Sequence, residues 1–108
     1  AWCMGVEWKD CGFFGALQGT QVIATEFVAY ARLGEAIQKE SIGHRTAEIA
    51  TYALCGFANL PSIAIQIGGL SAIAPQRRSD FATLGLRAMT AGALACWMTG
   101  SVAGLFIT

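Results

Sequence analysis

Apolar and charged residues form long blocks along this chain, and the blocks predict membrane-length helices rather than the core helices of a soluble domain. The longest apolar block covers 49–76 and contains no charged side chain. It is about 28 residues, or roughly 42 Å as a helix, against about 30 Å for the hydrocarbon core of a bilayer. Its centre holds Asn59, Pro61 and Ser62. We therefore predict a transmembrane helix over 49–73 that is broken at its middle.

A second apolar block predicts an uninterrupted transmembrane helix over 81–108. Small residues recur every four positions along it and predict a smooth ridge for close helix packing. These residues are Ala88, Gly92, Cys96, Gly100 and Gly104. The short loop 74–80 between the two blocks carries Arg77 and Arg78, so the positive-inside rule predicts that it is cytoplasmic.

Two further apolar stretches, 11–24 and 27–31, are each too short to cross a bilayer. Thr25 and Glu26 separate them. This pattern predicts a re-entrant helical hairpin over 11–34, which enters the membrane, turns at a polar tip and returns.

The remaining two segments are richer in polar residues. Tryptophans beside charged residues in 1–10 predict a segment at the membrane–water interface. The segment 35–48 holds many of the charged side chains and predicts an aqueous connection. The expected fold class is an all-α membrane protein.

Composition supports a membrane protein and excludes other classes. Charged residues are 13% of the chain, about half the usual share of roughly 25% for soluble domains. The formal net charge is +0, so we expect no nucleic-acid partner. The chain starts at Ala1 and has no signal-peptide pattern, and we interpret it as a fragment of a larger protein.

Motifs for catalysis or metal binding are absent from the sequence. There is no GxSxG, phosphate-binding loop or HExxH, and His44 stands alone in a polar segment. The four cysteines lack metal-site spacing, and a bond between Cys3 and Cys11 has no support beyond their closeness in sequence. We predict that the protein is not an enzyme and holds no cofactor or metal in this chain.

Pro61 is the residue that predicts the helix break. Proline lacks an N–H and clashes with the carbonyl four residues earlier, here that of Phe57, and it disfavours helical backbone at Leu60. A second half-helix would then begin near Ser62 with free N–H groups. With the amide of Asn59 and the hydroxyl of Ser62, this centre suits a hydroxyl-rich ligand. The alternative is a proline kink whose polar groups bond to neighbouring helices.

Glu26 is the second candidate site residue. A carboxylate at bilayer depth costs a few kcal/mol and usually faces a cavity or a partner. The alternative places the hairpin tip among the lipid headgroups, where a glutamate costs little. Gln21, Thr20 and Thr25 lie at the same tip, either lining the same cavity or only forming the turn.

Several motifs, in order, resemble the concentrative (sodium-coupled) nucleoside transporter family. TYALCGFAN at 51–59, IGGL at 67–70 and APQRR at 74–78 are similar to the family pattern. EFVAY at 26–30 resembles the family signature NEFVAY, and MGVEW at 4–8 and the residues around 86–92 are also similar. The resemblance covers nearly the whole chain and matches the C-terminal portion of the family.

The resemblance implies a homotrimeric, multi-pass symporter of the plasma membrane that moves nucleosides by alternating access. In such proteins the hairpin glutamate and the broken-helix Asn and Ser contact the ribose, which by motif match are Glu26, Asn59 and Ser62. Sodium is the implied coupling ion, and most of its ligands belong to family segments outside this chain.

The chain departs from the family pattern at three supporting positions. Thr25 replaces the Asn of the signature, Gln21 replaces an upstream Lys, and Pro61 replaces a small residue. These departures motivate an alternative hypothesis, a diverged, non-transporting membrane scaffold or assembly module of the same fold. A channel with a re-entrant pore loop is a third hypothesis.

Overall fold

The computed structural model describes residues 1–107, which are mostly helical and contain no strand. Within this range the α-helices are α1 (Cys11–Ile23), α2 (Glu26–Gln38), α3 (His44–Ala53), α4 (Leu60–Ile73) and α5 (Arg78–Phe106). Three short 3-10 turns accompany them: η1 (Trp2–Met4), η2 (Trp8–Asp10) and η3 (Pro75–Arg77). The predicted all-α class is therefore correct.

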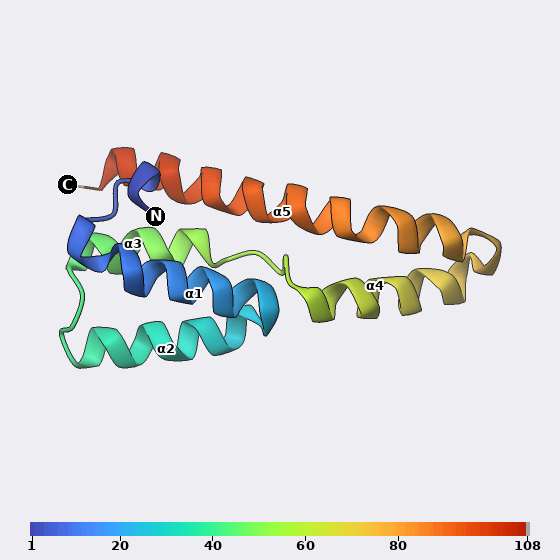
Figure 1. The fold of residues 1–108 in the computed structure, drawn as a ribbon, viewed down its shortest axis with the longest axis horizontal. Coiled ribbons are helices and arrows are strands. Elements are labelled where there is room, and N and C mark those ends of the chain that lie inside the picture. The colour runs from blue at the N-terminus through green and yellow to red at the C-terminus, as the bar shows by residue number, and fades with distance from the viewer. Residues whose placement is uncertain (108) are drawn as a thin grey trace.

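The long helix α5 runs along the whole molecule, which extends over 50 Å (Figure 1). α3 and α4 lie one after the other along α5 and both pack against it. α1 and α2 form an antiparallel pair beside α3, at the end of the molecule that also holds both chain termini (Figure 1). The junction between α3 and α4 therefore lies near the turn between α1 and α2.

The helical hairpin of the sequence prediction corresponds to α1 and α2. The chain reverses at Ala24 and Thr25, and Thr25 adopts extended backbone as the N-cap of α2. Its hydroxyl accepts a bond from the N–H of Val28 at 3.4 Å, which satisfies one free donor of the first turn. Each helix has 13 residues, or roughly 20 Å, so neither could cross a bilayer alone.

The segment 35–48, which the sequence predicts to be an aqueous connection, contains the ends of two helices. α2 continues to Gln38 and α3 begins at His44, so only the five residues between them are outside helices. Glu35, Arg45 and Glu48 lie on the helix ends, whose opposite faces bury Ala36 and Thr46, and Lys39 and Glu40 lie in the loop between them. The polar composition of 35–48 therefore did not indicate that α2 ends and α3 begins within this segment.

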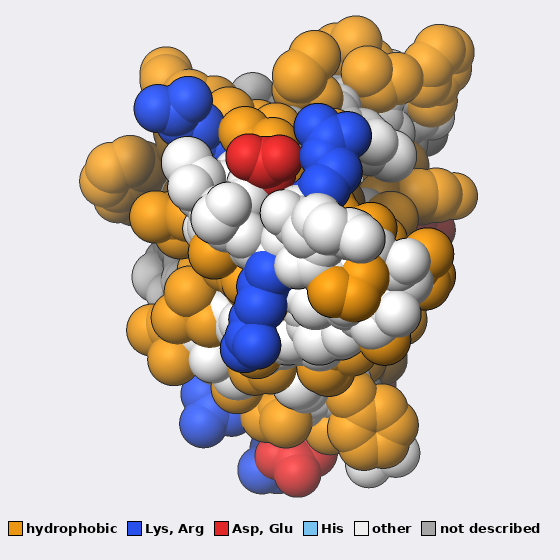
Figure 2. Space-filling view, turned by 90° about the vertical axis from the view of Figure 1, so that its right-hand side faces the viewer, with side chains coloured by type: hydrophobic (Ala, Val, Ile, Leu, Met, Phe, Trp, Pro, Cys, Tyr) orange, Lys and Arg blue, Asp and Glu red, His pale blue; other side chains and the backbone are white. Residues whose placement is uncertain are grey.

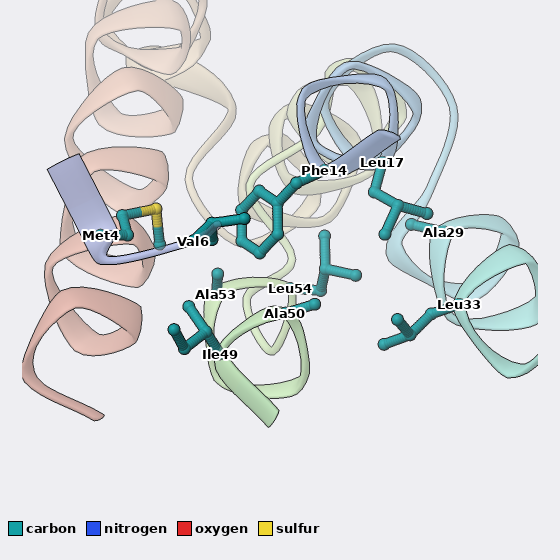
Figure 3. Close-up of a cluster of buried hydrophobic side chains, with 10 residues drawn as sticks. All are labelled: Met4, Val6, Phe14, Leu17, Ala29, Leu33, Ile49, Ala50, Ala53 and Leu54. Carbon is teal, nitrogen blue, oxygen red and sulfur yellow. The ribbon is translucent and has the colours of Figure 1, made fainter. Parts of the chain in front are cut away.

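The hydrophobic core lies where α1, α2, α3 and η1 meet (Figure 3). As Figure 3 shows, Phe14 of α1 lies beside Val6 and points toward α3, whereas Leu17 points toward Ala29 of α2. The other members complete a cluster that fastens the hairpin to α3. The cluster consists of Met4, Val6, Phe14, Leu17, Ala29, Leu33, Ile49, Ala50, Ala53 and Leu54.

The small-residue ridge of α5 packs closely, as its spacing predicts. A Cβ added at Gly100 would lie 2.9 Å from the Cβ of Ala53. One added at Gly104 would lie 2.6 Å from the carbonyl oxygen of Met4. These glycines let α3 and η1 approach the α5 backbone, where a side chain would force them apart.

Two polar contacts fix the beginning of α3. Asp10 accepts bonds from the Gly43 N–H at 3.1 Å and the Thr46 hydroxyl at 2.7 Å. The Arg45 guanidinium donates to the carbonyls of Gly104, at 2.7 Å, and of Ile107. A cation at these carbonyls also suits the negative end of the α5 dipole.

The pKa of the Asp10 carboxyl lies below its ordinary value of 3.8. Burial works to raise this pKa, but the bonds from Thr46 and Gly43 and the charge of Lys9 lower it by more in sum. The folded state therefore favours the ionised carboxylate.

The surface of α4 and of much of α5 is apolar. No side chain of α4 is buried within the described part of the chain, and α4 exposes Ile65 and Ile73. Figure 2 views the end formed by the α4–α5 turn, where charged groups are surrounded by hydrophobic side chains. The stretch Pro75–Phe106 has 32 residues and is long and apolar enough to cross a membrane, by length and composition.

Candidate functional site

The break between α3 and α4 lies before Pro61 rather than at it. α3 ends at Ala53, the chain is non-helical from Leu54 to Asn59, and α4 begins at Leu60. The expectation of a helix start near Ser62, with Leu60 outside the helix, was therefore wrong. Pro61 lies in the first turn of α4, where its missing N–H removes no intrahelical bond.

Asn59 ends the break and caps α4. Its Oδ1 accepts bonds from the N–H of Ser62 at 2.8 Å and from the Ser62 hydroxyl at 2.7 Å. Its backbone is extended, as an N-cap requires. The helix α4 therefore has a side-chain cap, and two hydrogen bonds join Asn59 to Ser62.

Glu26 reaches the same point from the hairpin. The Asn59 Nδ2 donates to Glu26 Oε2 at 2.7 Å, while Asn59 is only 1% exposed. Glu26 is the first residue of α2, so its carboxylate lies at the positive end of that helix dipole. The three predicted site residues, Glu26, Asn59 and Ser62, thus form one hydrogen-bonded cluster at the meeting point of two helix N-termini.

Gln21 contacts the break rather than lining an open cavity at the tip. Its side chain is 1% exposed, and its Nε2 donates to the carbonyls of Gly56 at 3.0 Å and of Leu54 at 3.3 Å. Gln21 thus bonds two carbonyls of the break, and the Asn59 N–H donates to a third, that of Phe57, at 3.0 Å. Thr25, the remaining supporting residue, serves as the cap of α2.

An apolar groove of about 510 Å³ begins at the cluster and runs between α4 and α5. Asn59 and Ser62 line its polar end, and Phe57 and Cys96 lie beside them. Glu26 is not among the lining residues, because it approaches Asn59 from the hairpin. The groove therefore adjoins the cluster without containing all of it.

Phe57 is a residue that the sequence reasoning missed. Its ring is 73% exposed on the non-helical segment, two positions before Asn59. The signal was present in the sequence, since an aromatic residue beside a glycine, Gly56, precedes the polar centre of the break. An exposed ring next to a hydrogen-bonding cluster offers a flat apolar surface to a ligand.

No group of three or more His, Cys, Asp or Glu side chains that could hold a metal ion occurs in residues 1–107. All four cysteines are free thiols. The cluster itself offers hydrogen bonding by a carboxylate, an amide and a hydroxyl.

Comparison with known proteins gives the family. A family model described as "Na+ dependent nucleoside transporter C-terminus" matches residues 1–104. Solute carrier family 28 member 3 of Eptatretus stoutii is 44% identical over 97% of this chain and 17% of its own length. The putative nucleoside permease NupX of Escherichia coli is 43% identical over 99% of this chain and 26% of its own.

The fold is also that of a solved transporter. The structure of CNTnw in an inward-facing substrate-bound state superposes with a TM-score of 0.93. It is 46% identical to this chain, over 98% of this chain and 26% of the solved one. The chain therefore spans about a quarter or less of the length of these relatives.

The family match and the fold are those of a transporter rather than an enzyme. The chain belongs to the Na+-dependent nucleoside transporter family and corresponds to its C-terminal portion. Members of this family are integral membrane proteins.

Proposed function

We propose that this chain is the C-terminal part of a sodium-coupled nucleoside symporter, in which Glu26, Asn59 and Ser62 bind the ribose. The observation that carries the proposal is the 2.7 Å bond between Asn59 Nδ2 and Glu26 Oε2, which joins the hairpin to the break. Membership of the family supplies the ligand class.

The chemistry of the cluster suits adjacent sugar hydroxyls. Asn59 engages one carboxylate oxygen of Glu26, so the second oxygen, Oε1, is left to accept a hydroxyl proton. The Ser62 hydroxyl can donate or accept once it turns away from Asn59 Oδ1. The exposed ring of Phe57 would cover an apolar face of the ligand.

The membrane arrangement is part of the same proposal. The short helices α1 and α2 form a re-entrant hairpin, α3 and α4 form one broken transmembrane helix, and α5 is a full span. The polar cluster then lies near the bilayer midplane, where non-helical backbone is accepted because it lines a binding cavity. The α4–α5 turn, with Arg77 and Arg78, faces the cytoplasm.

The whole transporter would be a homotrimer of multi-pass chains in the plasma membrane. Sodium is the transported coupling ion, and its ligands lie mostly in parts of the protein outside this chain. Alternating access would move the hairpin relative to the remainder around the nucleoside site.

The alternative of a non-transporting scaffold rested on the residue departures, and their local geometry gives it no support. Thr25 caps α2, and Pro61 occupies a position in the first turn of α4 that tolerates proline. Neither residue disrupts the Glu26–Asn59–Ser62 cluster.

Uptake of labelled uridine or adenosine by cells that express the full-length protein tests the function. We expect Glu26→Gln to reduce uptake at least tenfold at equal surface expression, because the charge-assisted bonds to the sugar are weakened. Glu35→Gln is the matched control, since Glu35 is exposed on the same helix. Normal uptake by the Glu26 variant would contradict the site assignment.

A further inference from the structure

We propose that Gln21 is the positioning residue of this site: it holds the non-helical segment 54–59 against the hairpin so that Glu26 and Asn59 stay paired. The observation is the pair of bonds from its Nε2 to the carbonyls of Leu54 and Gly56. The consequence for ligand binding rests on the proposed nucleoside site.

The break leaves backbone carbonyls that no helix satisfies. Beyond Ala53, Leu54 and Gly56 carry acceptors without a helical partner, and an unpaired buried carbonyl costs free energy comparable to a lost hydrogen bond. Gln21 supplies the donor to both. On the last turn of α3, the Tyr30 hydroxyl of α2 donates to the carbonyl of Thr51 at 2.7 Å. Both hairpin helices therefore donate hydrogen bonds to carbonyls at or just beyond the end of α3.

The orientation of the Gln21 amide follows from this environment. With Nε2 toward the two carbonyls it makes two bonds, whereas the flipped amide would place its oxygen against theirs. The Oε1 atom is consequently buried without a partner in the part of the chain that the structure describes. A buried amide with one unpaired end indicates that the two donated bonds outweigh this cost.

The position of Gln21 connects it to the ligand cluster. Gln21 lies at the end of α1 and Glu26 at the start of α2, on either side of the hairpin turn. They reach Gly56 and Asn59, which lie three residues apart on the break. The hairpin therefore contacts the break at two places, Gly56 and Asn59. Loss of the Gln21 bonds would leave Asn59 free to move away from Glu26.

Hydrogen exchange of the purified full-length transporter tests this role without any ligand. In Gln21→Leu we expect amides of 54–59 to exchange at least tenfold faster than in the wild type, while amides of α5 do not change. Gln21→Lys keeps a donor and should restore slow exchange. Gln38→Leu, the same change at an exposed position of α2, is the control.

Uridine titration of the same proteins tests the consequence for the site. We expect Gln21→Leu to raise the Kd for uridine at least tenfold, with recovery in Gln21→Lys. Should Gln21→Leu fail to fold, Gln21→Met replaces it, because its unbranched side chain is of similar length and has no donor for the two carbonyls.

The possible failures are distinguishable. Exchange over 54–59 within twofold of the wild type in Gln21→Leu or Gln21→Met would overturn the positioning role, whatever the ligand. Equal uridine affinity in wild type and variant would also overturn it. A wild-type protein that binds no nucleoside would instead contradict the proposed function, and the exchange measurement would still decide the role of Gln21.

Discussion

Asn59 uses both ends of its amide inside the cluster. Nδ2 donates to Glu26, and Oδ1 accepts two bonds from Ser62. A polar group that is nearly fully buried needs such partners, because desolvation of an unpaired amide costs about 1–3 kcal/mol. Asn59 therefore has a structural role as well as the proposed binding role, and Glu26→Gln is the cleaner probe since its amide oxygen can still accept from Asn59.

Gly56 has space for no side chain. A Cβ at this position would lie 2.0 Å from the Sγ of Cys96 on α5, while Gln21 holds the Gly56 carbonyl from the other side. We expect Gly56→Ala to destabilise the full-length protein by about 1–3 kcal/mol through overpacking, measured as a fall in the thermal unfolding midpoint.

The double variant Gly56→Ala with Cys96→Ala identifies the cause. The Cβ of Cys96 lies 3.6 Å from the added Cβ, which is an ordinary contact, so removal of the sulfur should recover most of the lost stability. If the double variant were as unstable as Gly56→Ala alone, the clash with Cys96 would not be the reason.

The buried carboxylate of Asp10 makes stability depend on pH. Its folded pKa is lowered, so its contribution is fully present above the unfolded value near 3.8 and is lost as pH falls through the folded pKa. We expect Asp10→Asn to unfold more easily at pH 7 by about 1 kcal/mol, because charge-assisted bonds become neutral ones. In thermal unfolding as a function of pH, the difference between the two proteins should shrink as pH falls from 3.8 through the folded pKa; a constant difference would contradict this account.

The break in the α3–α4 helix was predictable in kind but not in position. A charge-free run with a proline at its centre indicates an interruption. The run does not reveal that Asn59 caps the following helix, so that Pro61 falls inside the first turn instead of ending the previous one. The capping preference of Asn59 and the steric restriction that Pro61 places on Leu60 favour different starting points for α4. The structure begins α4 directly after the Asn59 cap.

The contact of Gln21 with the break could not be predicted from the sequence. Its acceptors on Leu54 and Gly56 lie 33 and 35 residues away, and only the packing of the hairpin on α3 brings them together. The bond between Glu26 and Asn59 also spans 33 residues, and the family resemblance predicted only that both residues contact the ribose. Long-range partners follow from tertiary structure, not from local pattern.

Close packing of α5 on α3 yields a prediction for the helix pair. A Cβ at Gly100 would lie 2.5 Å from Met4 Cε and 2.9 Å from Ala53 Cβ, so Gly100→Ala should destabilise the protein by about 1–3 kcal/mol. Gly34→Ala on α2 is the matched control. It meets no atom within 4 Å and should be neutral or stabilising by up to about 1 kcal/mol in thermal unfolding. Equal effects at the two positions would contradict the packing argument.

The molecule as a whole presents more apolar surface than a soluble domain of its size could keep in water. α4 has no buried side chain in residues 1–107, and long parts of α5 are exposed, including Leu86, Met98 and Leu105. In the proposed transporter, these faces would contact lipid and the remainder of the protein, because the chain spans about a quarter or less of its relatives' length. The polar cluster is the exception to this apolar character.

The most direct test of the central claim is the thermal stability of the purified full-length protein with and without uridine or adenosine. A ligand that binds only the folded state stabilises it, by about 2.7 kcal/mol at a hundredfold excess over its Kd. We predict such a shift for the wild type and its loss at the same nucleoside concentration for Glu26→Gln. A wild-type protein whose unfolding midpoint does not move at saturating nucleoside, or a Glu26 variant that is stabilised equally, would contradict the account.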